Sequence, residues 1–224
     1  MSSIVKFYRK HNSFVELRQQ NHTAEVKALE QLNILGSQPN FGGDLSATHQ
    51  KILNRVWIDL FGEANDKSPK FSLTPSVIEE INNLDDKNLS RYLVHRYRYE
   101  IFPQTHELDE YPPYLQIEPT SICNYRCVFC FETDKFFTRK SNGFMGHMSI
   151  DTFKKIIDQA EGNIEFISLA SRGEPLLCPN IEAMLAYTKD KFLNLKLNHP
   201  GRKLSPFFYL GDLFQPHPIC IHHL

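Results

Sequence analysis

Three of the five cysteines in this 224-residue chain lie within a stretch of eight residues. They are Cys123, Cys127 and Cys130, separated by three residues and then by two. Thiolates bind soft metal ions and iron–sulfur clusters, and a structural zinc site usually takes four ligands, often from two CxxC pairs. Because the chain has no second pair, the spacing favours a cubane cluster in which one iron has no protein ligand. Such an iron can bind a small molecule directly, which suits catalysis.

The composition restricts the class of protein in which these cysteines occur. Hydrophobic residues make up 41% of the chain and charged residues 23%, which is enough for a buried core. A formal charge of -1 creates no general field for nucleic acid or anionic lipid. Met1–Lys10 lacks the apolar centre of a signal peptide, and no apolar run is long enough to span a membrane. We expect a soluble cytoplasmic protein without a membrane or nucleic-acid partner, in which clustered cysteines form a metal or redox site.

A second polar motif, Ser171-Arg172-Gly173-Glu174-Pro175, follows the apolar segment 164–170. A glycine at a strand end lets a ligand approach the backbone, and a carboxylate or a carbonyl can accept a hydrogen bond from an ammonium group. The alternative is that Glu174 merely starts a helix after a turn. For the cysteines, the alternatives are zinc with a remote fourth ligand or a set of inert thiols.

The segments around these motifs predict an α/β fold. Strand patterns alternate with helix patterns, as in βαβ units that form a parallel sheet. The expected order is a strand at 114–119, a helix at 150–160, a strand at 164–170, a helix at 181–192 and a strand at 193–197. Right-handed crossovers bring the loops after these strands to one face, so both motifs should lie together.

The first 104 residues predict an all-α region. The expected helices cover 13–35, 46–62, a short segment from Pro75 to Ile81, and 88–102. The last of these mixes basic and aromatic residues, a pattern found in single-stranded nucleic-acid binding, although an amphipathic surface helix is the favoured interpretation. The predicted organisation is a helical region at 1–104, a sheet-containing core at 105–198 and an atypical tail at 199–224.

The CxxxCxxC motif with Phe129 before its last cysteine, placed after a first strand, resembles the radical S-adenosylmethionine (radical SAM) superfamily. The Gly173-Glu174-Pro175 motif after the second strand strengthens this resemblance. The resemblance implies that Cys123, Cys127 and Cys130 bind a [4Fe-4S] cluster whose fourth iron chelates S-adenosylmethionine. It also implies reductive cleavage of that cosubstrate to methionine and a 5′-deoxyadenosyl radical, which abstracts a hydrogen atom from a substrate that the sequence does not identify.

The same resemblance implies roles for further residues and partners. Gly173, Glu174 and Pro175 would hold the amino group of the cosubstrate, and Phe129 would flank its adenine, although Phe129 is also interpretable as a core residue. An electron donor such as a flavodoxin or a ferredoxin is expected. The long loop 131–148 would either cover the cluster or pack over the rim of the barrel.

A complete radical SAM core has six βα units and needs roughly 200 residues. After Tyr114 the sequence accommodates only about three units, so we expect a partial barrel in a C-terminally truncated or altered chain. Its open sheet edge would need a partner chain. An alternative function is therefore a catalytically inactive cluster-binding fragment, and a less favoured one is a zinc-binding interaction module.

Overall fold

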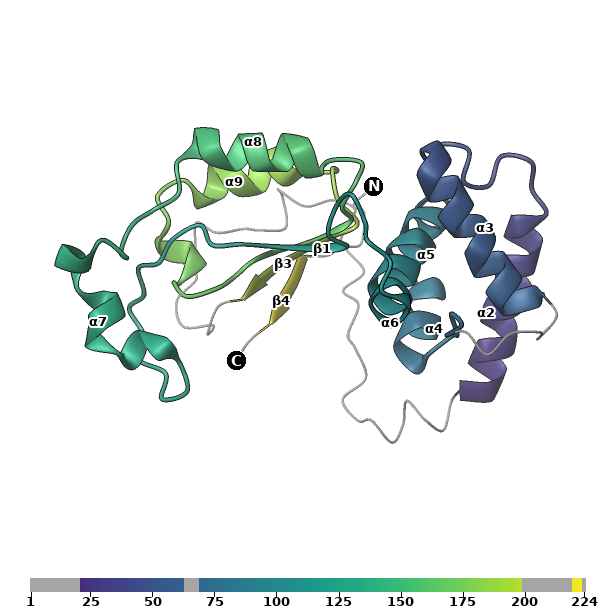
Figure 1. Ribbon diagram of the computed structural model, residues 1–224, viewed down its shortest axis with the longest axis horizontal. Helices are drawn as coiled ribbons and strands as arrows, with labels where there is room; N and C mark the ends of the chain where they lie inside the picture. The colour runs from purple at the N-terminus through teal and green to yellow at the C-terminus, as the bar shows by residue number, and fades with distance from the viewer. Residues whose placement is uncertain (1–20, 63–68, 199–218, 223–224) are drawn as a thin grey trace, which may run out of the picture. The chain divides into compact units, whose positions relative to one another are not determined.

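The computed structural model describes residues 21–62, 69–198 and 219–222 (Figure 1). The chain divides into two compact units, Met1–Glu110 and Tyr111–Leu224. The first unit is helical and the second is mixed α/β. The part of the predicted first helix before Asn21, and the predicted tail apart from residues 219–222, lie outside the described residues.

The helical unit confirms the predicted helices with shifts of a few residues. Its elements are α2 (Asn21–Gly36), α3 (Ala47–Phe61), α4 (Pro75–Ile81), α5 (Asp86–Glu100) and the single turn α6 (Phe102–Thr105). Ser46 caps α3 as predicted, because its hydroxyl accepts a hydrogen bond from the His49 backbone N–H at 3.2 Å. Thr74 precedes α4, where Pro75 occupies the first turn, but its side chain makes no capping hydrogen bond.

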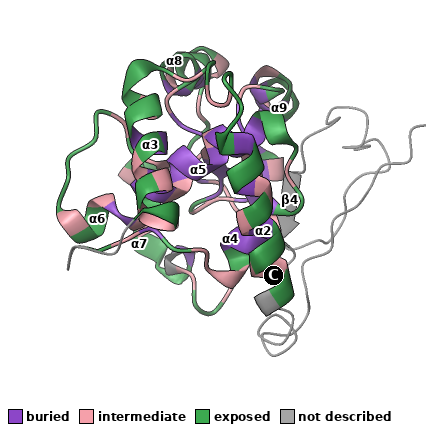
Figure 2. Ribbon diagram, turned by 90° about the vertical axis from the view of Figure 1, so that its right-hand side faces the viewer, coloured by how far each residue is buried: buried purple, intermediate pink, exposed green. Residues whose placement is uncertain are grey.

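Helix α5 is the central helix of this unit, so the prediction that this segment forms a surface helix is wrong. Nine of its fifteen residues are buried, and Figure 2 shows the buried colour along it. Leu89, Leu93 and Tyr97 repeat at helical spacing on the buried side. The buried Arg98 guanidinium donates to the Asp109 carboxylate at 2.5 Å, which compensates its charge inside the unit.

The second unit contains four parallel strands in the order β1-β2-β3-β4. They are β1 (Tyr114–Ile117), β2 (Phe166–Leu169), β3 (Asn194–Asn198) and β4 (Ile219–His222). Side chains alternate between the two faces of a strand, and the register aligns Leu115 with Ile167 and Leu195 on one face. The next apolar row on that face, Ile117 with Leu169 and Leu197, lies nearer the carboxyl ends of the strands.

Helices α8 (Ile150–Ala160) and α9 (Ile181–Thr188) cover this apolar face (Figure 1). Ser149 caps α8 by accepting from the Thr152 backbone N–H, and the buried Phe153 and Ile157 follow at a spacing of four. Met184 of α9 packs into the same core. Each fully buried side chain of this kind contributes about 1.5–3 kcal/mol of burial free energy.

The other face of the sheet is polar where the strands align Gln116 with Ser168 and Lys196. The mixed α/β fold with a parallel sheet is thus confirmed, whereas β1 and β4 are open edges of the sheet over the described residues rather than neighbours in a closed barrel. The prediction of about three βα units missed β4, which lies in the segment expected to be an atypical tail. No described helix is both long and apolar enough to cross a membrane.

Candidate functional site

The loop that carries the three cysteines leaves the end of β1 and is tied at its base to the chain that returns before α8. Ser121 N–H donates to the Gly146 carbonyl at 3.0 Å, and Gly146 N–H donates to the Ser121 hydroxyl at 2.8 Å. Met148 N–H donates to the Pro119 carbonyl at 2.9 Å. These bonds fix both ends of the loop beside the carboxyl end of the sheet, where parallel α/β folds place their sites.

Within this loop, the cysteines are free and half-buried. Cys130 N–H donates to the Cys127 carbonyl at 2.9 Å, which forms a tight turn, and Tyr125 N–H donates to Cys123 Sγ at 3.4 Å. The Arg126 guanidinium holds the start of the loop by donating to the Cys123 carbonyl at 3.0 Å. Backbone and side-chain bonds thus hold the cysteine backbone while leaving the thiols available.

The Gly173 loop packs directly against the cysteine loop through the backbone. A Cβ atom on Gly173 would lie 2.0 Å from the Thr120 carbonyl oxygen and 3.0 Å from the Ile122 carbonyl oxygen, so only glycine fits there. The next residue, Glu174, donates its backbone N–H to that Ile122 carbonyl at 3.0 Å. The structure therefore brings the two motifs together one residue before Cys123.

An ion pair joins the ends of β1 and β2 beside this contact. The Arg172 guanidinium donates to both Glu118 carboxylate oxygens, with Nη2 at 2.9 Å and Nε at 3.2 Å from Oε1. Burial raises the pKa of Glu118, but hydrogen bonds from the Arg172 side chain and backbone and from Ser171 outweigh it and hold the pKa below its ordinary value. Glu118 is therefore charged, and its ion pair with Arg172 connects the two loops.

Glu174 and Pro175 begin the one-turn element η3 (Pro175–Leu177), and both are buried. Glu174 Oε1 accepts a hydrogen bond from the Leu176 backbone N–H at 3.2 Å. The alternative that Glu174 starts a helical turn is therefore confirmed, and it is compatible with ligand binding through the same carboxyl group. Burial raises the pKa of Glu174, and the bond from Leu176 only partly opposes it.

Phe129 lies on the open side of the cysteine loop. Its side chain is 80% exposed, so the alternative that Phe129 is a core residue is wrong. An exposed ring beside the second and third cysteines remains available to a planar ligand, and the neighbouring Val128 is exposed as well.

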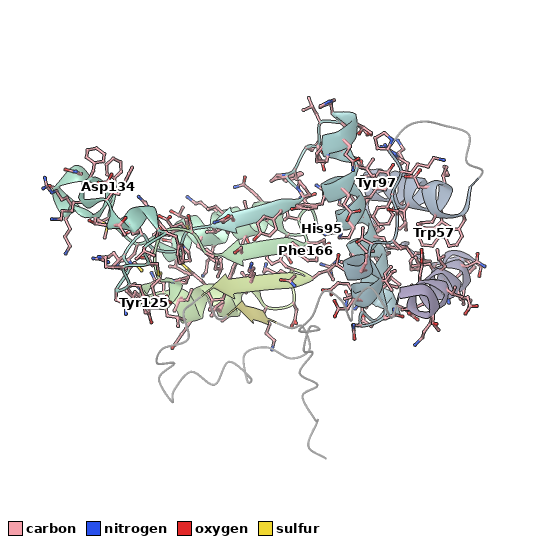
Figure 3. The ribbon with its side chains drawn as sticks, turned by 90° about the horizontal axis from the view of Figure 1, so that it is seen from below. Trp57, His95, Tyr97, Tyr125, Asp134 and Phe166 are labelled. Carbon is pink, nitrogen blue, oxygen red and sulfur yellow. The ribbon has the colours of Figure 1, made fainter. Side chains whose placement is uncertain are left out.

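The segment that follows forms η1 (Phe131–Thr133), α7 (Lys135–Thr138) and η2 (Lys140–Asn142). Tyr125 and Asp134 lie in this loop region beyond the strands, at the opposite end from Phe166 at the start of β2 (Figure 3). The rings of Phe136, Phe137 and Phe144 contact one another with centroids 5.4–5.7 Å apart. This aromatic cluster stabilises the fold of the loop. The role of loop 131–148 as a cover over the iron–sulfur cluster stays a prediction.

Three charged residues of the site carried no assigned role at the sequence level. Glu118 and Arg172 lie inside recognisable segments, and opposite charges at two adjacent strand ends are a signal that could have paired them. Glu132 is different, since its carboxylate is 2% exposed although it lies in a polar stretch of a long loop. Nothing in the sequence pattern indicates that burial.

The donor set fits an iron–sulfur cluster. Over the described residues, no three His, Cys, Asp or Glu side chains are grouped so that they could hold a metal ion. A cubane does not need its ligands to converge on one ion, because each thiolate binds a different iron and the sulfurs lie further apart than around a single zinc. Three free thiols on one anchored loop, which packs against the Gly173 loop through the backbone, meet that requirement.

Comparison with known proteins agrees with this site. Residues 117–207, about two fifths of the chain, match the family model of the Radical SAM superfamily. The matched segment begins in β1 and includes the CxxxCxxC motif and the Gly173 loop, so the predicted resemblance is confirmed for this segment. No curated protein and no solved structure matches the chain.

Proposed function

We propose that the chain is a radical SAM protein in which Cys123, Cys127 and Cys130 hold a [4Fe-4S] cluster that binds S-adenosylmethionine. The observation that carries this proposal is the backbone contact between Gly173 and Thr120, together with the bond from Glu174 to Ile122. A cosubstrate bound to the cluster must touch both loops at once, and these contacts fix the two loops side by side.

The bound group would supply one-electron reductive cleavage of the cosubstrate's carbon–sulfur bond, which yields methionine and a 5′-deoxyadenosyl radical for hydrogen abstraction. The chain's own residues bind and orient. Gly173 lets the backbone of its loop lie against the cysteine loop, Glu174 and the adjacent carbonyls accept from the amino group of the methionine moiety, and Pro175 fixes the turn behind them. Phe129 offers an apolar wall for the adenine.

The polar face of the sheet is the region where we expect the substrate to bind. In register across β1, β2 and β3, Gln116, Ser168 and Lys196 provide hydrogen-bonding groups on the face away from α8 and α9. A flavodoxin or ferredoxin would supply the electron, and a partner chain would cover an open edge of the sheet. The substrate itself is undefined.

Anaerobic reconstitution of the full chain tests this function. We expect about four irons and four sulfides per chain, the spectrum of a [4Fe-4S] cluster, and release of 5′-deoxyadenosine when a strong reductant and S-adenosylmethionine are added. A cluster without cosubstrate cleavage would instead indicate an inactive cluster-binding protein. Bound zinc without sulfide would contradict both functions.

A further inference from the structure

Helix α7 and the turn after it expose a group of basic side chains close to the cysteines. The basic residues of the loop 131–148 are Lys135, Arg139 and Lys140, and all three are exposed. Of the two acidic residues in this loop, Glu132 is buried and only Asp134 is exposed. None of the three basic side chains forms a salt bridge with an acidic residue in the described part of the chain. Because the whole chain carries a formal charge of -1, this excess of positive charge is local.

Two aromatic rings of the same loop are exposed as well. Phe136 is 56% exposed and Phe144 is 39% exposed, and their ring centroids lie 5.4 Å apart. The two rings therefore form one continuous apolar patch. Basic residues precede and follow these rings along the chain, and an apolar centre with a polar rim is the composition of a protein-binding surface. The α7 surface is made up of Lys135, Phe136, Arg139, Lys140 and Phe144.

The α7 surface lies close to the position at which the cysteines would hold a cluster. It begins five residues after Cys130. Five residues of extended chain span at most about 18 Å, and the turn η1 shortens this reach because Thr133 N–H donates to the Cys130 carbonyl at 3.1 Å. Figure 1 shows α7 beyond the carboxyl end of the sheet, on the loop that leaves β1. A partner bound at α7 is therefore near the cluster.

The size of the α7 surface indicates the kind of partner that it fits. A cluster held by the cysteines would need one electron from outside the chain for each cleavage of the cosubstrate. Proteins that deliver single electrons form weak complexes with small interfaces, and one helical turn with two exposed rings provides a surface of that size. Single-stranded nucleic acid is less suited, because it binds along a groove that follows successive phosphates, whereas these three cations lie within six residues.

We propose that the α7 surface docks an acidic electron-transfer protein whose carboxylates face Lys135, Arg139 and Lys140. This inference rests on the proposed function and adds the place where the electron enters the chain. One electron leaves the donor, which is oxidised, and reduces the cluster, and no proton or other atom is transferred. Opposite charges steer the two proteins together, and the exposed rings form the apolar centre of the contact.

Reversal of charge on the α7 surface tests the proposal. The reconstituted full chain and its double variant Lys135→Glu, Lys140→Glu are titrated calorimetrically, at low and at high salt, with a flavodoxin of strongly negative net charge. We expect the double variant to bind at least about tenfold more weakly at low salt, and the wild type to lose affinity as salt screens the charges. Reduced flavodoxin should also reduce the cluster of the double variant more slowly, whereas dithionite should reduce both clusters to the same extent.

A matched double variant controls for net charge. Lys155→Glu, Lys189→Glu reverses two exposed lysines of the same unit, one in α8 and one at the end of α9. It should change the affinity for flavodoxin by less than about threefold, because these charges lie outside the contact. Equal losses in the two double variants would assign the effect to net charge and overturn the proposal. If Lys135→Glu, Lys140→Glu assembles no cluster, Lys135→Gln, Lys140→Gln replaces it, and unchanged affinity of that variant overturns the proposal.

The remaining outcomes separate this proposal from the proposed function. A wild type that forms its cluster but binds no flavodoxin, or an affinity that neither salt nor Lys135→Glu, Lys140→Glu changes, overturns docking at α7 and leaves the proposed function standing. Weaker binding of the double variant to anionic phospholipid vesicles or to single-stranded RNA, with unchanged binding to flavodoxin, also overturns it. A wild type that assembles no cluster overturns the proposed function and this inference with it.

Discussion

Arg172 and Glu118 form a two-pronged ion pair that ties the end of β2 to the end of β1. The pair lies between the loop that carries the cysteines and the loop that carries Gly173, since Glu118 precedes the first and Arg172 opens the second. A guanidinium presents two parallel donors to a carboxylate, which fixes orientation as well as distance. The distance between the cysteine motif and the Gly173 motif therefore depends on an ion pair whose two residues do not belong to the same motif.

We expect Arg172→Ala to lower the free energy of unfolding of the second unit by about 1–2 kcal/mol at pH 7, because it removes hydrogen bonds between charged groups that are mostly shielded from solvent. The pKa of Glu118 is held below its ordinary value of 4.5, so the pair stabilises fully above that pH. As the pH falls below 4.5 and Glu118 gains a proton, the difference between wild type and Arg172→Ala should shrink. Denaturant unfolding from pH 7 to 3, followed by circular dichroism, measures this.

The matched variant is Glu118→Gln, alone and combined with Arg172→Ala. If the pair acts as a unit, the double variant should lose less stability than the sum of the single variants. Additive losses would mean that each side chain acts through other neighbours.

We expect Gly173→Ala to separate the two loops. The new methyl group would meet the Thr120 carbonyl oxygen at 2.0 Å, a contact with backbone that cannot be relieved by rotating a side chain. Overpacking of this kind costs about 1–3 kcal/mol, and the shift should also weaken the Glu174–Ile122 bond. Denaturant unfolding should reveal the loss of stability, and titration of the reconstituted protein should reveal weaker binding of S-adenosylmethionine.

Gly146→Ala is the control for that substitution. Gly146 also lies at the base of the cysteine loop, but no atom lies within 4 Å of the position its Cβ would take. Stability and cosubstrate affinity should therefore stay close to the wild type. Equal losses in the two variants would assign the effect to general stiffening of the loop rather than to the Thr120 contact.

The amino-acid pattern was sufficient for the elements with strong local signals. The predicted helix at 150–160 has the bounds of α8, and the run 164–170 predicted β2. Strand β4 was missed because it is only four residues long, follows Pro216 and Pro218, and pairs with β3 through contacts distant in sequence. Helix α5 was misjudged for a related reason, since the charged Arg98 suggests a surface position, and its ion pair with Asp109 is distant from the local pattern.

The residues of the candidate site also divide into those that the local sequence pattern identifies and those that it does not. Thiol spacing and the glycine motif are local chemistry, so the sequence identified Cys123 and Gly173. Glu132 is buried within a polar stretch of the loop, and the close approach of Gly173 to Thr120 depends on the register between β1 and β2. Such contacts carry no periodicity that a single sequence reveals.

Cysteine substitutions should separate ligands from core residues. Cys127→Ala should abolish cluster assembly, as measured by iron and sulfide content after reconstitution. Cys178→Ala should keep the full cluster, because Cys178 is buried in the hydrophobic core beside α9, and should cost about 1 kcal/mol of unfolding free energy for the small cavity. An intact cluster in Cys127→Ala, or a lost one in a folded Cys178→Ala, would mean that the ligands are misassigned.

Two ion pairs of the helical unit should differ in their effect on stability. The Arg98 side chain is 2% exposed beside Asp109, whereas Arg55 and Glu107 are each more than a third exposed. We expect Asp109→Ala to destabilise the unit by about 3–5 kcal/mol, because it removes a carboxylate partner from the buried Arg98 charge, and Arg55→Ala by about 1 kcal/mol, because its ring contacts and its exposed pair are weak. Trp57, the chain's one tryptophan, lies in α3 and reports unfolding of this unit by fluorescence. Similar losses for the two variants would show that burial does not set the strength of these pairs.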